Sequence, residues 1–280
     1  MRRLIPLLSV LFALGAGIAL GAGPLDDNRS TAAPSTHTRA RTSSALDATF
    51  ASTVAPALYA HRLAKQSVAV VTTPGVAPAT VKALVDQVVA AGGAVSSRTD
   101  LTDALTAPGQ KTLVDTMGSQ LATQLGSQVP SLADPALTTY PRMGSLVGLA
   151  VATTGAPSAA PSAPSSTVRE SLKAAKLTND VGNAGVAPLV LVVLGHNLDD
   201  AIVNGLVQGI ATQAHGVVVV GRTKSGDIAS LRARKAPVAT VDGVETAAGR
   251  VAGVLALVRQ ITGGNGSFGA SGIDGPVPVG

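Results

Sequence analysis

Two stretches of the chain share one pattern: an unbroken apolar run, a turn, an amphipathic helix, a glycine and a second apolar run. The first stretch has a β-branched run at 67–73, followed by helically spaced Val and Leu residues at 81–89. The second has the apolar run 188–194 and the run 216–220, a glycine followed by four valines. Unbroken apolar runs are typical of strands covered on both faces, and helical spacing indicates a helix with one buried side. The pattern therefore predicts two β-α-β units with parallel strands.

Further segments extend this arrangement. Strands are expected at 94–96 and 237–241, and helices at 110–125 and 245–261. The expected buried stripe of the 110–125 helix consists of Leu113, Met117, Leu121 and Leu125. The sequence therefore predicts an α/β fold, with a mostly parallel sheet of about five strands and helices on both faces.

The N-terminal segment has the pattern of a membrane anchor. Arg2 and Arg3 precede an uncharged apolar run from Leu4 to Leu25, and two acidic residues follow it. A run of about 20 apolar residues can cross a bilayer as a helix, and basic flanking residues favour the cytoplasmic side. We therefore expect one N-terminal transmembrane helix in a single-pass protein of the cell membrane or envelope, with the C-terminal domain extracytoplasmic. A cleaved signal peptide is the alternative, because the small residues at 19–23 suit a signal peptidase.

Composition shifts along the chain predict its organisation. Residues rich in Ser, Thr and Ala without an apolar period are typical of flexible segments. The expected parts are a membrane anchor or signal peptide at 1–25, a flexible spacer with a short helix (46–65) at 26–66, an α/β domain at 67–262 with a disordered Ser/Ala/Pro loop at about 153–166, and a disordered tail at 263–280.

The composition excludes several classes of protein. The net charge is +5, but only 13% of the residues are charged and 2% are aromatic, so we expect no nucleic-acid partner. The longest basic cluster, Arg232–Lys235, is interpreted as a solvated loop. The chain has no cysteine, which excludes disulfides, cysteine nucleophiles and thiolate metal sites.

The glycine-rich segment and the turns do not have the pattern of a phosphate-binding site. The segment Gly264–Gly269 matches the letters of the dinucleotide fingerprint, but that site needs a strand before the glycines and a helix after them. Here a helix precedes the segment and a disordered end is expected after it, so we reject a dinucleotide site. The turns at 73–75 and 195–197 lack a phosphate-binding glycine pattern. Topology alone leaves a ligand crevice at the carboxyl ends of the strands open.

Residues that could ligate a metal are few and scattered. The histidines are His37, His61, His196 and His215. Of these, His196 would lie at the carboxyl end of a strand, and His215 would end the next helix, where a protonated imidazole suits the helix dipole. The methionines are Met1, Met117 and Met143, and Met117 lies on a predicted buried stripe. No pair has metal-ligand spacing, so the metal ligands are unknown.

Acidic residues are better explained as helix starts than as catalytic pairs. Asn197 is expected to cap a helix whose first turn holds Asp199 and Asp200. Thr167 and Glu170 form a capping box that predicts another helix start. Glu245 is expected at the start of the last helix. The sequence has neither a nucleophile elbow nor a P-loop, and we expect that the chain is not an enzyme.

Four stretches together resemble one family. They are 11–24 (LFALGAGIALGAGP), 55–71 (APALYAHRLAKQSVAVV), 98–105 (RTDLTDAL) and 241–257 (VDGVETAAGRVAGVLAL). The chain is similar to the actinobacterial copper transporter family typified by mycobacterial MctB. The resemblance implies a membrane- or envelope-associated protein tied to copper efflux or copper resistance, with copper as the possible ligand. For the type member, channel activity is proposed.

The chain departs from this family in two places. Family members usually carry a long coiled coil after the anchor, which here shrinks to the spacer at 26–44 and a short helix. Their tail commonly ends in a motif containing His and Tyr, which Ser267-Phe268-Gly269 replaces here. The resemblance therefore transfers no set of copper ligands to this chain.

A single apolar helix does not enclose a water-filled path through a bilayer. A pore would need a homo-oligomer, or the role in copper handling would be indirect, through other envelope proteins. Two interpretations are therefore open. The chain is a copper-handling envelope protein, or it is an anchored structural or interaction module with no direct metal transport. The expected partners are the membrane, further copies of the chain and envelope proteins.

Overall fold

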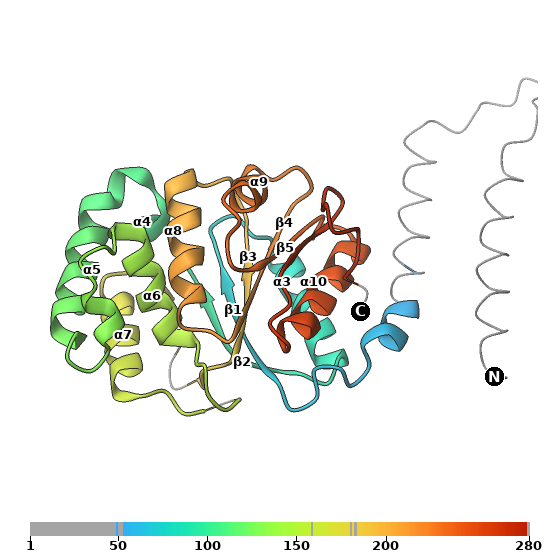
Figure 1. Cartoon of the computed structure of the whole chain (residues 1–280), viewed down its shortest axis with the longest axis horizontal. Coiled ribbons are helices and arrows are strands. Elements are labelled where there is room, and N and C mark those ends of the chain that lie inside the picture. The colour runs from blue at the N-terminus through green and yellow to red at the C-terminus, as the bar shows by residue number, and fades with distance from the viewer. Residues whose placement is uncertain (1–48, 50–52, 158, 180, 182–183, 279–280) are drawn as a thin grey trace, which may run out of the picture. The chain divides into compact units, whose positions relative to one another are not determined.

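The computed structural model describes residues 49, 53–157, 159–179, 181 and 184–278 (Figure 1). The chain separates into two units, Met1–Ser43 and Ser44–Gly280, and the first lies wholly outside the described residues. The strands are β1 (Ser67–Thr72), β2 (Ala94–Asp100), β3 (Leu189–Val193), β4 (Gly216–Gly221), β5 (Ala239–Asp242) and β6 (Gly266–Gly269). The α-helices are α3 (Pro78–Ala90), α4 (Asp103–Thr106), α5 (Lys111–Leu125), α6 (Thr139–Val151), α7 (Ala163–Ala174), α8 (Asp200–Ala211), α9 (Gly226–Ala233) and α10 (Ala247–Gln260). Residues 53–59 are also helical.

The sheet confirms the predicted α/β class and its parallel strands. Its order is β2-β1-β3-β4-β5-β6, and every neighbouring pair is parallel. The five expected strands are present, and β6 is an addition. The chain first extends the sheet from β1 to β2 and then continues from β3 on the other side of β1. The carboxyl ends of β1 and β3 therefore form the topological switch point, where ligands of such folds commonly bind.

Successive side chains of the central strands enter two separate hydrophobic cores. Val68 and Val70 of β1 pack with α3 and α10, whereas Ala69 and Val71 pack with the helices α5 to α8. The same alternation holds along β3 and β4. Figure 1 shows α3 and α10 on one face of the sheet and α5, α6, α7 and α8 on the other. Covered faces on both sides explain why these strands read as unbroken apolar runs.

Helix α6 was not predicted, and it packs closely on α8. A Cβ atom built on Gly209 would overlap the carbonyl oxygen of Pro141 and the amide nitrogen of Ser145. A Cβ on Gly144 would likewise overlap the backbone of Leu206. The two helix backbones therefore touch without side chains between them, an approach that only glycine permits. This contact anchors the helical layer to one face of the sheet.

The expectation of a disordered tail at 263–280 is wrong for its described part, because residues 266–269 form β6 beside β5. Arg232 holds this strand. Its Nη2 lies 3.1 Å from Asp242 Oδ1 and donates to the carbonyl oxygen of Phe268 at 2.6 Å. The backbone N–H of Ser271 also donates to Asp242 at 3.1 Å. Arg232 is therefore a largely covered structural cation of α9, which corrects the interpretation of Arg232–Lys235 as a solvated loop. In the dinucleotide fingerprint a strand precedes the glycines and a helix follows them. In this chain the last four residues of Gly264–Gly269 themselves form strand β6.

Two further boundaries differ from the sequence predictions. Helix α7 begins at Ala163, since the Ser162 hydroxyl accepts the Ser165 N–H at 3.2 Å and caps it. The Thr167 capping box is therefore wrong. The segment 153–166 is also more ordered than expected in its described residues, because Ala159 forms an isolated bridge with Val186.

In α5 the buried stripe includes Val114 rather than Leu113, which is 40% exposed.

Within the described ranges, no helix combines the length and the apolar character needed to cross a bilayer. The apolar run 4–25 and most of the predicted spacer lie outside those ranges, so the transmembrane helix stays a prediction.

Candidate functional site

Two loops meet at the switch point between β1 and β3. The loop after β1 and the loop after β3 bind each other, because Gly195 N–H donates to Thr73 Oγ1 at 2.9 Å and His196 N–H donates to Pro74 O at 3.0 Å. Gly75 has a φ of +83°, and a Cβ there would overlap the imidazole ring of His196. The ring therefore covers the turn after β1. His196 thus follows the carboxyl end of β3, as the sequence predicts, and makes a packing contact there.

A small cleft of about 200 Å³ lies beside these loops. Its charged lining residues are Arg222 and Glu245, and Thr80 of α3 also faces it. Both carboxylate oxygens of Glu245 accept the Thr223 N–H, at 3.1 and 3.2 Å. Burial opposes ionisation of Glu245, but the hydrogen bonds from Thr223 and the charge of Arg222 outweigh it, so its pKa is lowered. Glu245 thus stays ionised and fixes the loop after β4, which makes it a poor general base.

The other described histidines are exposed and lie far apart in the chain. His61 has a φ of +60° in the turn before β1. His215 does not end α8, since that helix stops at Ala211; its Nε2 lies 3.0 Å from the carbonyl oxygen of Ile261, at the end of α10. His215 therefore contacts the C-terminus of α10 and not, as predicted, that of the helix before it. His37 lies outside the described residues.

The described part of the chain contains no group of three or more His, Cys, Asp or Glu residues able to hold a metal ion. Met143 is fully buried in the core, and Met117 is partly buried against the same core. Met1 lies outside the described residues. Soft ligands suited to Cu(I) are therefore not gathered at one point in the described domain.

The acidic residues singled out in the sequence lie at the start of a helix or within one. Asp199, rather than Asn197, caps α8, and its side chain accepts the Ala201 N–H at 2.8 Å. Asp200 lies in the first turn of α8, as predicted. Glu170 was predicted at the third position of a helix. It is instead an exposed residue well inside α7, because that helix begins at Ala163.

Sequence reasoning missed Asp227, which is 1% exposed near the start of α9. Its Oδ1 accepts the Leu198 N–H at 2.9 Å, while its Oδ2 has no hydrogen-bond partner. Burial, with a smaller contribution from the negative charge of Asp200, raises its pKa despite the Leu198 hydrogen bond. No sequence signal identifies this residue, because its burial comes from the packing of α8 and α9.

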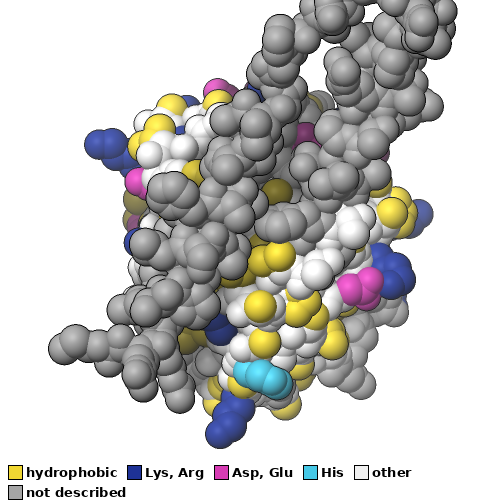
Figure 2. Space-filling view, turned by 90° about the vertical axis from the view of Figure 1, so that its right-hand side faces the viewer, with side chains coloured by type: hydrophobic (Ala, Val, Ile, Leu, Met, Phe, Trp, Pro, Cys, Tyr) yellow, Lys and Arg dark blue, Asp and Glu magenta, His cyan; other side chains and the backbone are white. Residues whose placement is uncertain are grey.

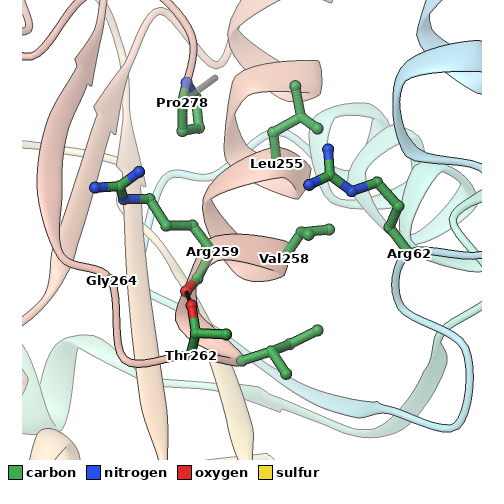
Figure 3. Close-up of a pocket in the computed structure, with 8 residues that line it drawn as sticks. Arg62, Leu255, Val258, Arg259, Thr262, Gly264 and Pro278 are labelled. Carbon is green, nitrogen blue, oxygen red and sulfur yellow. Dashed lines mark hydrogen bonds between the residues drawn. The ribbon is translucent and has the colours of Figure 1, made fainter. Parts of the chain in front are cut away.

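A groove of about 440 Å³ lies along the end of α10 (Figure 3). Its apolar lining comes from Leu255, Val258, Ile261 and Pro278. Arg62, which precedes β1, and Arg259 of α10 bring guanidinium groups to it from two sides. Arg259 also lies over the ring of Phe268, with Cζ 5.8 Å from the ring centroid. The groove therefore has an apolar floor on α10 with one arginine on each side.

The side of the domain that carries α10 and α3 is seen in Figure 2. Hydrophobic side chains gather on it, with Lys, Arg, Asp and Glu side chains towards the edges. Two of the large hydrophobic residues that the described part exposes are Leu58 (47% exposed) and Val89 (58%). This side therefore combines exposed apolar groups with charged groups of both signs.

Comparison with protein families gives a match over residues 2–278, to the family described as "Copper transport outer membrane protein, MctB". The chain belongs to this family. The match includes both the N-terminal apolar run and the α/β domain, and it confirms the resemblance found in the sequence. No curated protein sequence matches the chain. For this member of the MctB family, the family description names copper and an outer membrane, which agrees with the expected copper-related envelope class.

Proposed function

We propose that this chain is an envelope protein held at a membrane by its N-terminal apolar run, and that it takes part in copper efflux or copper resistance. The observation that carries the proposal is the family match over residues 2–278. The uncharged run between Arg3 and Asp26 supports the attachment, since its length suits a bilayer. In this proposal the α/β domain lies on the extracytoplasmic side.

In this proposal, copper handling requires more than one protein chain. One apolar helix does not form a path for an ion, so the chain acts through assembly with its own copies or with other envelope proteins. Copper is the cargo in this proposal rather than a resident cofactor, and the proposal assigns the chain no enzymatic reaction.

The alternative function is an anchored interaction module without direct metal transport. It is motivated by the described domain, in which His196 packs on the turn after β1 and the described residues include no candidate metal cluster. The two proposals differ in what removal of the protein does to cellular copper.

A deletion strain tests the choice. Growth and cell-associated copper are measured across a copper titration, with the full chain returned on a plasmid as the control. The copper proposal expects poorer growth and more cell copper in the deletion strain, both reversed by the full chain. Unchanged growth and unchanged cell copper would favour the interaction module.

A further inference from the structure

Two buried side-chain oxygen atoms at the junction of α8 and α9 have no hydrogen-bond partner among the described residues. They are Oδ2 of Asp227, on α9, and Oδ1 of Asn204, on α8. When the carboxyl group is ionised, both atoms are acceptors. A buried acceptor without a donor carries a cost in free energy. A group that could become a donor at this junction would therefore stabilise it.

Asn204 reaches the side of α9 that carries Asp227. Its Nδ2 donates to Ser230 Oγ at 2.8 Å. Ser230 follows Asp227 by three residues, so the two side chains are neighbours on α9. Asp200 belongs to the same junction, because its carbonyl oxygen accepts the Asn204 Nδ2 at 2.6 Å and its charge acts on the Asp227 carboxyl group. The two unpartnered oxygens are therefore part of one small polar junction.

The neighbours of the Asn204 amide fix its orientation. A carbonyl oxygen accepts hydrogen bonds and does not donate them, so the amide nitrogen must face the carbonyl oxygen of Asp200. Turning the amide by 180° would place two acceptors against each other. Oδ1 of Asn204 therefore stays an acceptor, and Asp227 is the group that becomes a donor when it takes up a proton.

The charges around Asp227 do not favour its ionised form. Asp200, in the first turn of α8, is negative and opposes ionisation, as burial does. The other charged or titratable side chains of the surrounding elements are exposed or bound to each other. They are His196 and Asp199 before α8, Arg222 and Lys224 after β4, Asp242 of β5, and Arg232 and Arg234 in and after α9.

Asp227 also holds the loop between β3 and α8. Its Oδ1 accepts the Leu198 N–H at 2.9 Å. The same loop carries His196, which packs on Gly75, and Gly195, which lines the cleft of about 200 Å³ beside the switch point. The protonation state of Asp227 therefore acts on a loop that lines this cleft.

We propose that Asp227 is a pH-dependent switch for the loop between β3 and α8. In the neutral form its Oδ2–H donates to Asn204 Oδ1 while Oδ1 accepts from Leu198, and the loop is held against α9. When the proton leaves to solvent, the two oxygens become acceptors without a donor, beside the charge of Asp200. The loop then separates from α9 more often. This inference is independent of the proposed function, since it uses described residues alone.

Hydrogen exchange of the full chain in detergent micelles tests the switch, from about pH 4 to about pH 8. The rates are corrected for the intrinsic effect of pH on exchange. Because burial raises the pKa of Asp227, the neutral form is lost as pH rises through the raised value. We expect protection of residues 196–204 to fall about tenfold over this range, the effect of one hydrogen bond.

The titration of Asp227 itself is followed by nuclear magnetic resonance with carbon-13-labelled aspartate. Its carboxyl signal is the one that Asp227→Asn removes. The midpoint of this titration should coincide with the midpoint of the change in exchange. A titration without any change in exchange would overturn the proposal.

Three variants make the test specific. Asp227→Asn keeps an oxygen for Leu198 and supplies an amide donor to Asn204 at every pH, so the loop should keep its low-pH protection throughout. Ser230→Ala removes a different hydrogen bond of Asn204 and should lower protection equally at all pH values. The matched control, Asp86→Asn, makes the same substitution at an exposed carboxylate and should leave the pH dependence unchanged.

Two further results would overturn the switch. One is a pH dependence of the loop that persists in Asp227→Asn. The other is a loss of protection in β3 and β4 together with the loop, which would show that the whole domain unfolds. Protection in these two strands also reports whether each variant is folded.

Discussion

Arg232 of α9 and Asp242 at the end of β5 form an ion pair, with Nη2 and Oδ1 3.1 Å apart, and Asp242 is 1% exposed. The pair joins the last predicted strand to a strand that the sequence pattern does not reveal. Its other hydrogen bonds end on Phe268 and Ser271, in the segment that forms and follows β6. The edge of the sheet therefore depends on a polar network together with the buried ring of Phe268.

The first prediction concerns this network. Asp242→Asn leaves the Arg232 charge without its buried partner, so the free energy of unfolding should fall by about 3 kcal/mol. Denaturant unfolding measures the change, and hydrogen exchange should show faster exchange in residues 266–272. The exposed pair Lys82–Asp86 is the control, since Lys82→Ala should change stability by less than about 0.5 kcal/mol. Equal effects of the two substitutions would contradict the structural role of Asp242.

The Asp242 carboxyl should also contribute to acid sensitivity. Burial opposes its ionisation, but the hydrogen bonds from Ser271 and Arg232 and the charge of Arg232 outweigh it, so its pKa is lowered in the folded state. A lowered folded-state pKa stabilises the protein above the ordinary Asp value and loses this effect as pH falls towards the lowered value. The stability difference between the wild type and Asp242→Asn should therefore shrink on acidification below about pH 4. A difference that grows on acidification would contradict this sign.

Asp227 should show the opposite pH dependence. Burial raises its pKa, so the folded state binds its proton more tightly than the unfolded state. Its contribution to stability is therefore largest below the ordinary Asp value and is lost as pH rises through the raised value. Asp227→Asn keeps an oxygen for the Leu198 N–H and removes the buried charge, so it should stabilise the protein by about 1 kcal/mol at pH 7. Denaturant unfolding at pH 7 and at pH 3.5 measures this, and a gain that is greater at the lower pH would contradict it.

The contact between α6 and α8 leads to a packing prediction. In Gly209→Ala the new methyl group meets backbone atoms of Pro141 and Ser145, which cannot rotate away. The free energy of unfolding should therefore fall by about 3 kcal/mol. Gly109→Ala is the matched control, because a Cβ at that position meets no atom within 4 Å. If both substitutions give the same unfolding midpoint, the two helices are farther apart than the structure places them.

The central strands were predictable because strands buried on both faces appear in the sequence as unbroken apolar runs. The run at 188–194 contains β3, and the valines at 216–220 lie within β4. Helix α6 was missed because its contact residues are glycines, which have low helix propensity. Gly144 and Gly148 match the spacing of Gly205 and Gly209, and comparing these two pairs would have suggested the contact.

Predictions for the candidate site succeeded less well, since the groove is assembled from distant segments. Arg62 precedes the first strand and Pro278 ends the described chain, and no local pattern links them to Arg259. Strand β6 was missed for the same reason, because Asp242 and Arg232 hold it from other elements. Interactions over long sequence distances decide both features, and a single sequence does not reveal such pairs.

Membrane attachment through residues 4–25 is the central claim, and fractionation of cells that express the full chain tests it most directly. Membranes are washed with alkaline carbonate, which releases peripheral proteins, and the chain is followed with an antibody to the α/β domain. We predict that the full chain stays in the membrane pellet until detergent is added, and that Leu8→Asp with Leu11→Asp shifts it to the aqueous fraction. Recovery of the unaltered chain in the aqueous fraction without detergent would contradict the account.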